Sequence, residues 1–282
     1  MDLSAFAPAF DKQVDTILSW LSDNAGFLFD GARLVLEGLF NGILWLVNLP
    51  PFYVVAILAG LAVWRLMGLK FGILAALAMV FCAGMGLWPE TMSTLALVIA
   101  ASVIALAIGL PLGVAAGLMP GLDRALAPAL DLIQTMPPYI YLLPSIALLG
   151  FGPATALVAT VIVAMPPAIR LTSLGIRMTP NEFIELAQAL GTGRMQTFFK
   201  IRLPFAVPSI MAGVNQSLMM AFGMVVIAGI VGSGGLGETI YGAIRKLDIA
   251  RSIDASIAIV ILTMVLDRLT QSMAAAAQKA EE

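Results

Sequence analysis

The sequence contains no histidine and one cysteine among its 282 residues. Histidine is the side chain that most often serves as an acid, a base or a metal ligand near neutral pH, so its absence removes the commonest route to catalysis. Cys82 has no second cysteine with which to form an internal disulfide, and a single thiol without a histidine is a poor candidate nucleophile. We therefore predict no catalytic residue and no metal site, and we interpret Cys82 as a packing residue.

Charged residues are also scarce, at 11% of the chain, whereas 60% of the residues are hydrophobic and the mean hydropathy is +0.99. A soluble domain usually has about a quarter charged residues, so the excess apolar surface needs lipid to face. The net charge of −2 and the lack of a basic tract argue against nucleic acid as a partner. The composition predicts a protein that crosses the lipid bilayer several times.

Two motifs of nucleotide binding are missing or unsupported. The chain has no G-x-x-x-x-G-K-[ST] phosphate loop, so a process that needs ATP would need a separate subunit to bind it. Residues 232–237 fit G-x-G-x-x-G, but this fingerprint requires a preceding strand, which a membrane span does not provide. We interpret these residues as a flexible turn that re-enters the membrane or caps a pathway.

Seven apolar segments predict membrane crossings, because a helix of about 20 residues spans the hydrocarbon core. The predicted crossings are 52–67, 71–87, 92–119, 126–149, 154–174, 206–231 and 253–269. Segment 34–49 is shorter and contains Glu37, Asn41 and Asn48, so we expect an amphipathic helix in the membrane interface, with an extra crossing as the alternative. The N-terminus lacks the basic region of a cleavable signal peptide.

Basic residues near the span ends set the expected orientation. Arg65, Lys70 and Arg124 fall on the side that also receives the basic residues of 170–202, and this side is predicted to be cytoplasmic. The N-terminus is then outside the cell and the C-terminus is in the cytoplasm. One loop departs from the rule, because residues 245–251 place three basic side chains on the outer side.

Prolines and glycines predict how the crossings bend and pack. The pairs Pro137-Pro138 and Pro166-Pro167 predict kinked helices that face protein or a pathway, because the freed backbone groups need partners. Gly109, Gly113 and Gly117 recur on one helix face and permit close helix approach. We interpret this glycine series as internal packing, with a dimer seam as the alternative.

A long polar segment interrupts the apolar pattern after residue 177. We expect a helix from about Asn181, with Thr179 as its cap and Pro180 in its first position. Gly191-Thr192-Gly193 would end this helix, and a second short helix would run over 194–201 toward the membrane.

The spacing within this segment resembles the "EAA" loop of ABC importer permeases. It reads E-x-A-x-x-x-G, followed after nine residues by I-x-L-P. The resemblance implies a cytoplasmic helix that docks into a groove on a separate ATPase, with small residues that let the partner approach. The residues it assigns to coupling are Glu185, Ala187, Ala189, Leu190, Gly191, Leu203 and Pro204.

A wider resemblance narrows the family. Segments 203–216, 224–228 and 259–271 look like permeases of the glycine betaine/proline (ProU-type) systems, and the similarity extends over 90–271. It implies an all-α membrane protein with a type I (MetI-like) core of five helices, preceded by two extra spans and an interfacial helix. The implied parts are an extracytoplasmic N-terminal region (1–49), accessory helices (50–89), a permease core (90–274) with a coupling loop (178–205), and a cytoplasmic tail (275–282).

The same resemblance implies function and partners. The chain would be the permease of an ATP-driven importer in the bacterial cytoplasmic membrane, moving trimethylammonium compounds such as glycine betaine, choline, carnitine, proline betaine or trimethylamine N-oxide. It implies a homodimer, two ATP-binding cassette ATPase subunits that bind ATP and magnesium, and an extracytoplasmic substrate-binding protein, with no cofactor in this chain. The alternatives are an ABC permease for amino acids or methionine, or a secondary transporter, which the scarcity of acidic residues in the spans disfavours.

Two groups of residues are candidates for the pathway. Tyr139 and Tyr141 could offer a cation-friendly surface near the outer face, since aromatic rings attract ammonium groups, although ordinary interface aromatics are the alternative. An adaptable apolar gate could form from methionine and phenylalanine side chains, with core packing as the alternative. The candidate gate residues are Met219, Met220, Phe222 and Met224.

Overall fold

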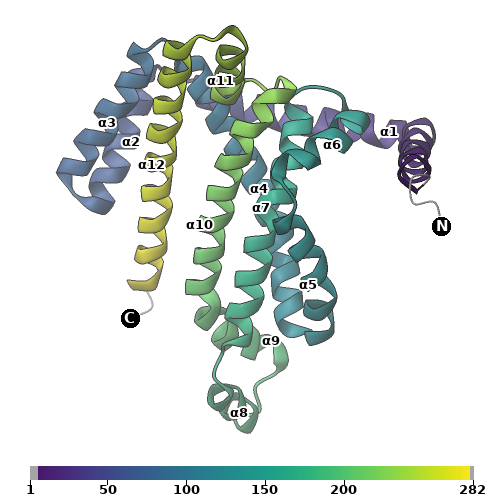
Figure 1. The fold of residues 1–282 in the computed structure, drawn as a ribbon. Coiled ribbons are helices and arrows are strands. Elements are labelled where there is room, and N and C mark those ends of the chain that lie inside the picture. The colour runs from purple at the N-terminus through teal and green to yellow at the C-terminus, as the bar shows by residue number, and fades with distance from the viewer. Residues whose placement is uncertain (1–5, 280–282) are drawn as a thin grey trace.

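The computed structural model describes residues 6–279, and every regular element in that range is a helix (Figure 1). The elements are α1 (Phe6–Asn48), α2 (Phe52–Met67), α3 (Leu69–Gly84), α4 (Trp88–Leu118), α5 (Pro120–Thr135), η2 (Pro138–Tyr141), α6 (Leu142–Leu149), α7 (Pro153–Arg177), α8 (Asn181–Ala189), α9 (Arg194–Thr197), η3 (Phe198–Arg202), α10 (Leu203–Ala228), η4 (Gly229–Val231), α11 (Gly235–Lys246) and α12 (Ile249–Lys279).

Helices α4, α7 and α10 form the centre of the molecule. Gly109 lies against Ala168, and Gly117 lies against Ile176, so α4 and α7 run parallel. Helix α10 runs antiparallel to α7, because Gly175 faces the residues at the start of α10. A Cβ on Gly117 would lie 2.8 Å from the Ile176 Cβ, which leaves no room for any larger residue. The glycine series of α4 is therefore internal packing, and that prediction is confirmed.

Four helical segments are long and apolar enough to cross a membrane alone: Trp88–Leu118, Pro153–Arg177, Arg194–Val231 and Ile249–Gln271. The two expected accessory crossings are shorter, because α2 and α3 have 16 residues each. At 1.5 Å per residue each reaches about 24 Å, compared with about 30 Å of hydrocarbon. They form a tight hairpin beside α12 (Figure 1), and their role as full crossings stays a prediction.

The predicted crossing over 126–149 contains the expected break at its proline pair, and its role as a single broken span stays a prediction. The chain breaks at Pro137, and the helices Pro120–Thr135 and Pro138–Leu149 meet at 106°. A proline lacks the backbone N–H and disfavours helical geometry in the residue before it, so two in succession end α5. The second proline pair has a different outcome, because α7 continues through Pro166 and Pro167 and buries both against protein.

Helix α1 continues without interruption through the segment that we expected to be a short interfacial helix. It meets α2 at 89° and lies across the end of the bundle (Figure 1). Phe40 is buried in the central core, and Arg33 pairs with Glu37 at 2.8 Å beside Gly150. The interfacial position of 34–49 stays a prediction. Of the predicted terminal regions, residues 1–5 and 280–282 lie outside the described residues.

Residues 235–237 are buried and tightly packed, unlike the flexible turn expected over 232–237, whereas Gly232 at the start of the segment is exposed. Gly229 touches the backbone of Gly237, and a Cβ on Gly235 would lie 2.6 Å from the Thr94 Oγ1. The Leu236 N–H donates to this same hydroxyl oxygen at 2.8 Å. Together these contacts fasten the start of α11 to η4 and to α4.

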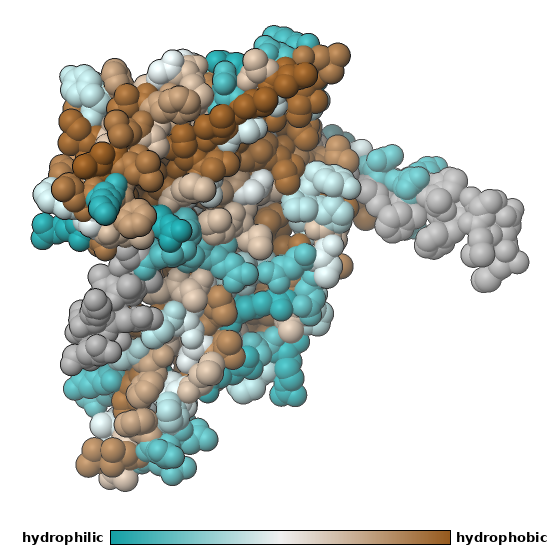
Figure 2. Space-filling view, turned by 60° about the vertical axis from the view of Figure 1, so that its left-hand side comes forward, coloured by the Kyte–Doolittle hydropathy of each residue, from teal (hydrophilic) through white to brown (hydrophobic). Residues whose placement is uncertain are grey.

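The two ends of the bundle differ in character. Helix α11, the α11–α12 turn and the N-terminal end of α4 lie at one end, and α8 protrudes at the opposite end (Figure 1). Arg251, at the start of α12, pairs with Glu90 at 3.5 Å. The loop over 245–251, whose basic residues depart from the orientation rule, therefore lies at the end of the bundle away from α8, as its position in the sequence predicts. Figure 2 shows apolar residues gathered over the upper part of the molecule and hydrophilic residues toward the end that carries α8.

Candidate functional site: the polar loop between α7 and α10

Helix α8 begins at Asn181, where the sequence predicts it, but its start differs from the prediction. Thr179 does not cap it, because the Thr179 hydroxyl donates to the Ile176 carbonyl at 3.0 Å. The carbonyls in the last turn of α7 lack helical partners, and this hydroxyl satisfies one of them. Pro180 lies just before α8 in extended conformation, so the expectation that it is the first helical residue is also wrong.

The end of α8 is a glycine turn. Gly191 has a φ of +72°, the left-handed conformation that side chains disfavour. The Gly191 N–H donates to the Gln188 carbonyl at 2.9 Å, and the Thr192 N–H donates to the Ala187 carbonyl at 3.0 Å. This pair of bonds is a Schellman motif. The Thr192 hydroxyl adds a bond to the same Ala187 carbonyl at 2.6 Å, so the turn has a defined shape.

The second predicted helix is present as α9 followed by the π-turn η3, which leads directly into α10. Leu203 and Pro204 form the first turn of α10 and are half-buried. The loop therefore joins α7 to α10 through short helices at both ends.

An apolar stripe lies on the exposed surface of α8. Phe183, Leu186 and Leu190 are 43%, 56% and 73% exposed, and their spacing of three and four residues places them on one helix face. Leu190 was predicted from the sequence as a coupling residue, whereas Phe183 and Leu186 were not. Their i, i+3, i+7 spacing was the signal that could have identified them.

The predicted coupling residues do not all face outward. Ala187 is 3% exposed and, together with Leu186 and Leu190, lines a small pocket inside the loop. Its small side chain therefore packs within the loop, and its role in the approach of a partner stays a prediction. Glu185 and Ala189 are exposed.

Two ion pairs attach the broken helix α5 to α7. Asp123 accepts from Arg177 at 2.6 Å and from the Ser173 hydroxyl at 2.8 Å. About two helical turns before Arg177 on α7, Arg170 donates to Asp131 at 2.5 Å. Both residues of the second pair lie in segments predicted to cross the membrane, where the sequence analysis expected few ionisable groups. Within residues 6–279 the buried Arg170 Nε has no hydrogen-bond partner.

The candidate pathway residues separate into two groups. Tyr139 is 57% exposed, whereas the Tyr141 hydroxyl donates to the Ile133 carbonyl at 2.9 Å and fixes η2 to α5. Met219 and Met220 are about two-fifths exposed, but Phe222 and Met224 are 4% and 1% exposed in the central core. In this conformation the structure does not bring the four gate candidates together. Among the described residues no group of His, Cys, Asp and Glu side chains is arranged to hold a metal ion.

Comparison with known proteins agrees with this architecture. Residues 109–279 match the family described as "binding-protein-dependent transport system inner membrane component". The chain is 38% identical over 263 residues to the glycine betaine/proline betaine transport system permease protein ProW of Escherichia coli, covering 93% of this chain and 74% of ProW. It is 37% identical over 260 residues to the glycine betaine transport system permease protein OpuAB of Bacillus subtilis, covering 92% of each.

The fold is also similar to that of a solved transporter chain. The match to an inward-facing crystal form of the MetNI methionine ABC transporter has a TM-score of 0.60 at 24% identity, and it covers 68% of this chain and 95% of that one. The likeness shows the fold, a type I ABC importer core. The match over 109–279 and the two permease relatives then settle the family: the chain belongs to the binding-protein-dependent ABC importer permeases, the membrane-embedded transport subunits that work with a separate ATPase and a substrate-binding protein.

Proposed function

We propose that this permease imports a compact trimethylammonium solute, with glycine betaine as the first candidate. Both permease relatives are named as permeases of glycine betaine transport systems. Choline, carnitine, proline betaine and trimethylamine N-oxide carry the same methylated ammonium group. An amino-acid or methionine substrate is the second candidate, and the methionine transporter shares the fold at 24% identity.

The proposed assembly contains two copies of this chain and two ATPase subunits that bind ATP and magnesium. A single observation supports the attachment to the ATPase. Leu186 and Leu190 lie exposed at the end of the molecule that protrudes furthest, on a helix face that also includes the buried Ala187 and borders a small pocket against the loop. Burial of a leucine side chain contributes about 1.5–3 kcal/mol, so a groove that covers both would hold the helix firmly. With this end in the cytoplasm, the N-terminus is outside and the C-terminus inside.

The loop is placed to transmit movement to the bundle. Its first residues follow Arg177 at the end of α7, and its last residues continue into α10. The glycine series holds α4 against α7, and the ion pairs of Arg170 and Arg177 hold α5 there. A displacement of α8 by the ATPase would therefore move α4, α5, α7 and α10 together. We propose that this movement opens and closes the pathway in alternating access.

Tyr139 and the exposed Met219 and Met220 remain the proposed pathway residues, since they are available to a second copy or to a solute. Uptake by a variant with leucine at Tyr139 and Tyr141 tests the aromatic part of this proposal. We expect the affinity for external substrate to stay the same, because the binding protein sets it, and the maximal rate to fall. An unchanged rate would remove both tyrosines from the pathway.

The attachment is tested with Leu186→Asp and a matched Ile244→Asp control. Ile244 is 59% exposed, close to the value for Leu186, but it lies on α11 at the opposite end. We expect Leu186→Asp to weaken ATPase association more than tenfold in a pull-down from detergent, since the loss of one buried leucine exceeds 1.4 kcal/mol. The Ile244→Asp variant should retain the ATPase. Equal retention by both variants would contradict the proposed contact.

The substrate is tested by uptake into proteoliposomes that contain the permease, its ATPase and its binding protein. Labelled glycine betaine should accumulate with ATP inside the vesicles, and unlabelled choline, carnitine or trimethylamine N-oxide should identify any shared substrate by competition. Accumulation of methionine but not glycine betaine would favour the second candidate. Vanadate-resistant uptake by the permease alone would instead indicate a secondary transporter.

A further inference from the structure

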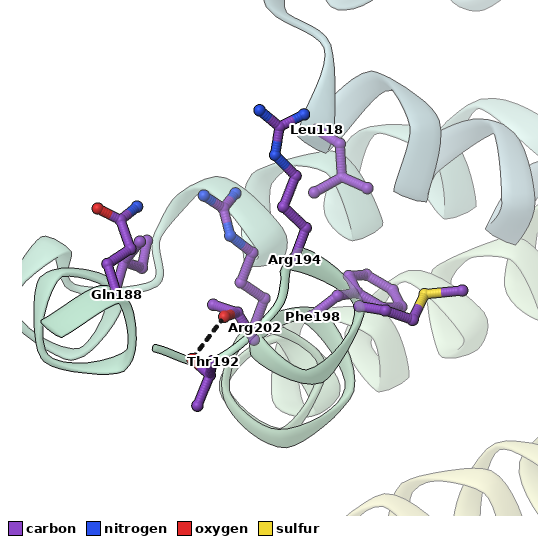
Figure 3. A pocket seen from close by; sticks show the side chains of 9 residues that line it. Leu118, Gln188, Thr192, Arg194, Phe198 and Arg202 are labelled. Atoms are coloured by element: carbon purple, nitrogen blue, oxygen red, sulfur yellow. Dashed lines mark hydrogen bonds between the residues drawn. The ribbon is translucent and has the colours of Figure 1, made fainter. Parts of the chain in front are cut away.

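A hollow of about 510 Å³ separates α8 from the cytoplasmic end of α4, and two arginines line it (Figure 3). Arg194 comes from the first turn of α9, and Arg202 comes from the end of η3. Figure 3 shows both guanidinium groups pointing the same way, toward the space between Gln188 and Leu118. The Gln188 side-chain amide lines the same hollow from α8.

No acidic side chain lines this hollow, and neither arginine has an ion-pair partner within residues 6–279. This sets them apart from Arg170 and Arg177 nearby, which both pair with aspartates of α5. Two guanidinium groups that share a hollow repel each other when no anion lies between them. The charge and shape of the hollow therefore fit an anion.

The position of the hollow indicates which anion. Arg202 directly precedes α10, and Leu118 ends α4, so the hollow is level with the boundary between these two spans and water. Its rim is apolar, because Leu118 and Met195 are 44% and 71% exposed. A phospholipid offers both parts: its phosphodiester can bind the arginines, and its acyl chains can pack against the apolar rim. Arginine forks match phosphate oxygens well, and basic pockets at the cytoplasmic ends of membrane helices bind lipid headgroups.

We propose that Arg194, Arg202 and Gln188 form a phosphoryl-binding site that takes the headgroup of an anionic phospholipid at the base of the coupling loop. The same chemistry would accept free phosphate. The site belongs to this chain alone, and its occupation depends on neither the transported solute nor the contact of Leu186 with the ATPase.

Native mass spectrometry of the purified, delipidated protein tests this site. Phosphatidylglycerol and phosphatidylcholine are added separately, and the retained lipid is counted for the wild type and for the Arg194→Gln/Arg202→Gln variant. We expect the wild type to retain phosphatidylglycerol preferentially and the double variant to bind it about thirtyfold more weakly, the effect of removing two basic groups at a lipid headgroup. Neither guanidinium takes part in the hydrogen bonds that close the loop, so the variant should fold.

The matched control is Arg124→Gln/Lys200→Gln, which removes two positive charges from the same end of the molecule without touching the hollow. This control should retain phosphatidylglycerol within a factor of about three of the wild type, since each charge acts mainly within about 10 Å. Equal losses in both double variants would overturn the site, because they would show a general surface attraction. Should the neutral pair of substitutions prevent folding, Arg202→Lys keeps the charge but removes the planar fork, and an unchanged affinity would also overturn the assignment.

Inorganic phosphate separates the two sources of the phosphoryl group. Displacement of bound phosphatidylglycerol by millimolar phosphate in the wild type shows that the headgroup chemistry suffices, and persistence of the lipid shows that the acyl chains contribute; either result supports the site. Unchanged lipid retention by the Arg194→Gln/Arg202→Gln variant, together with lost ATPase binding, would overturn it and assign both arginines to an acidic surface of the ATPase.

Discussion

The contact between α4 and α7 is tightest at Gly113 among the three glycines of the α4 series, so this position should be sensitive to a small substitution. A Cβ at Gly113 would lie 2.6 Å from the Thr172 Cβ and 2.8 Å from the Ile169 carbonyl oxygen. Both atoms are fixed by the backbone of α7, so neither can rotate away. Carbon atoms pack best at about 3.5–4.0 Å, so Gly113→Ala requires the two helices to separate by about 1 Å.

The expected cost follows from two opposing effects. Overpacking of this kind costs about 1–3 kcal/mol. Replacement of a helical glycine by alanine returns about 0.5–1 kcal/mol, because alanine loses less conformational freedom on folding. We therefore expect Gly113→Ala to destabilise the protein by about 1–2 kcal/mol net. Uptake should also fall, because α4 would no longer follow α7 closely.

The control is Gly42→Ala in α1, where nothing lies within 4 Å of the added Cβ. It receives the gain in helix stability without the clash and should be neutral or stabilising. Thermal unfolding of the detergent-solubilised protein, followed by the fluorescence of its 4 tryptophans, measures both variants. We expect Gly113→Ala to melt several degrees below the wild type. A melting temperature equal to that of Gly42→Ala would refute the reasoning from the glycine seam.

Three further predictions concern other contacts. Thr94→Val leaves the buried Leu236 N–H without an acceptor, so it should lower the stability by about 1–3 kcal/mol in the same melting assay. A stability within about 0.3 kcal/mol of the wild type would contradict this prediction. The single changes Asp131→Arg and Arg170→Asp should each reduce uptake, and the swapped double variant should restore it; no rescue would show that their mutual contact is unimportant. Gly191→Asp should abolish uptake and leave membrane insertion intact, because it adds strain of about 1 kcal/mol at a φ of +72° and a negative charge at the C-terminal end of α8. The Gly191→Asn control keeps most uptake, and normal uptake by the aspartate variant would contradict a coupling role.

Local sequence signals were sufficient to predict the loop helices and several features of the bundle. Asn181 was correctly placed at the start of α8, and the glycine at 191 correctly marked its end, because each signal acts through backbone geometry within a few residues. The glycine repeat from Gly109 to Gly117 likewise predicted a close helix contact. The break at Pro137 was foreseen as a kink, although the size of the bend, 106°, was not.

The sequence by itself determined that this chain is a membrane protein, that its polar loop forms two short helices, and that the loop has the spacing of an ABC importer permease. Only the tertiary structure decided which way the side chains face. It turned Ala187 inward, buried Phe222 and Met224 in the core, and paired Asp131 with Arg170 across 39 positions of sequence. These outcomes depend on which helices meet and at what rotation, and a pattern of residues along a single helix does not contain that information.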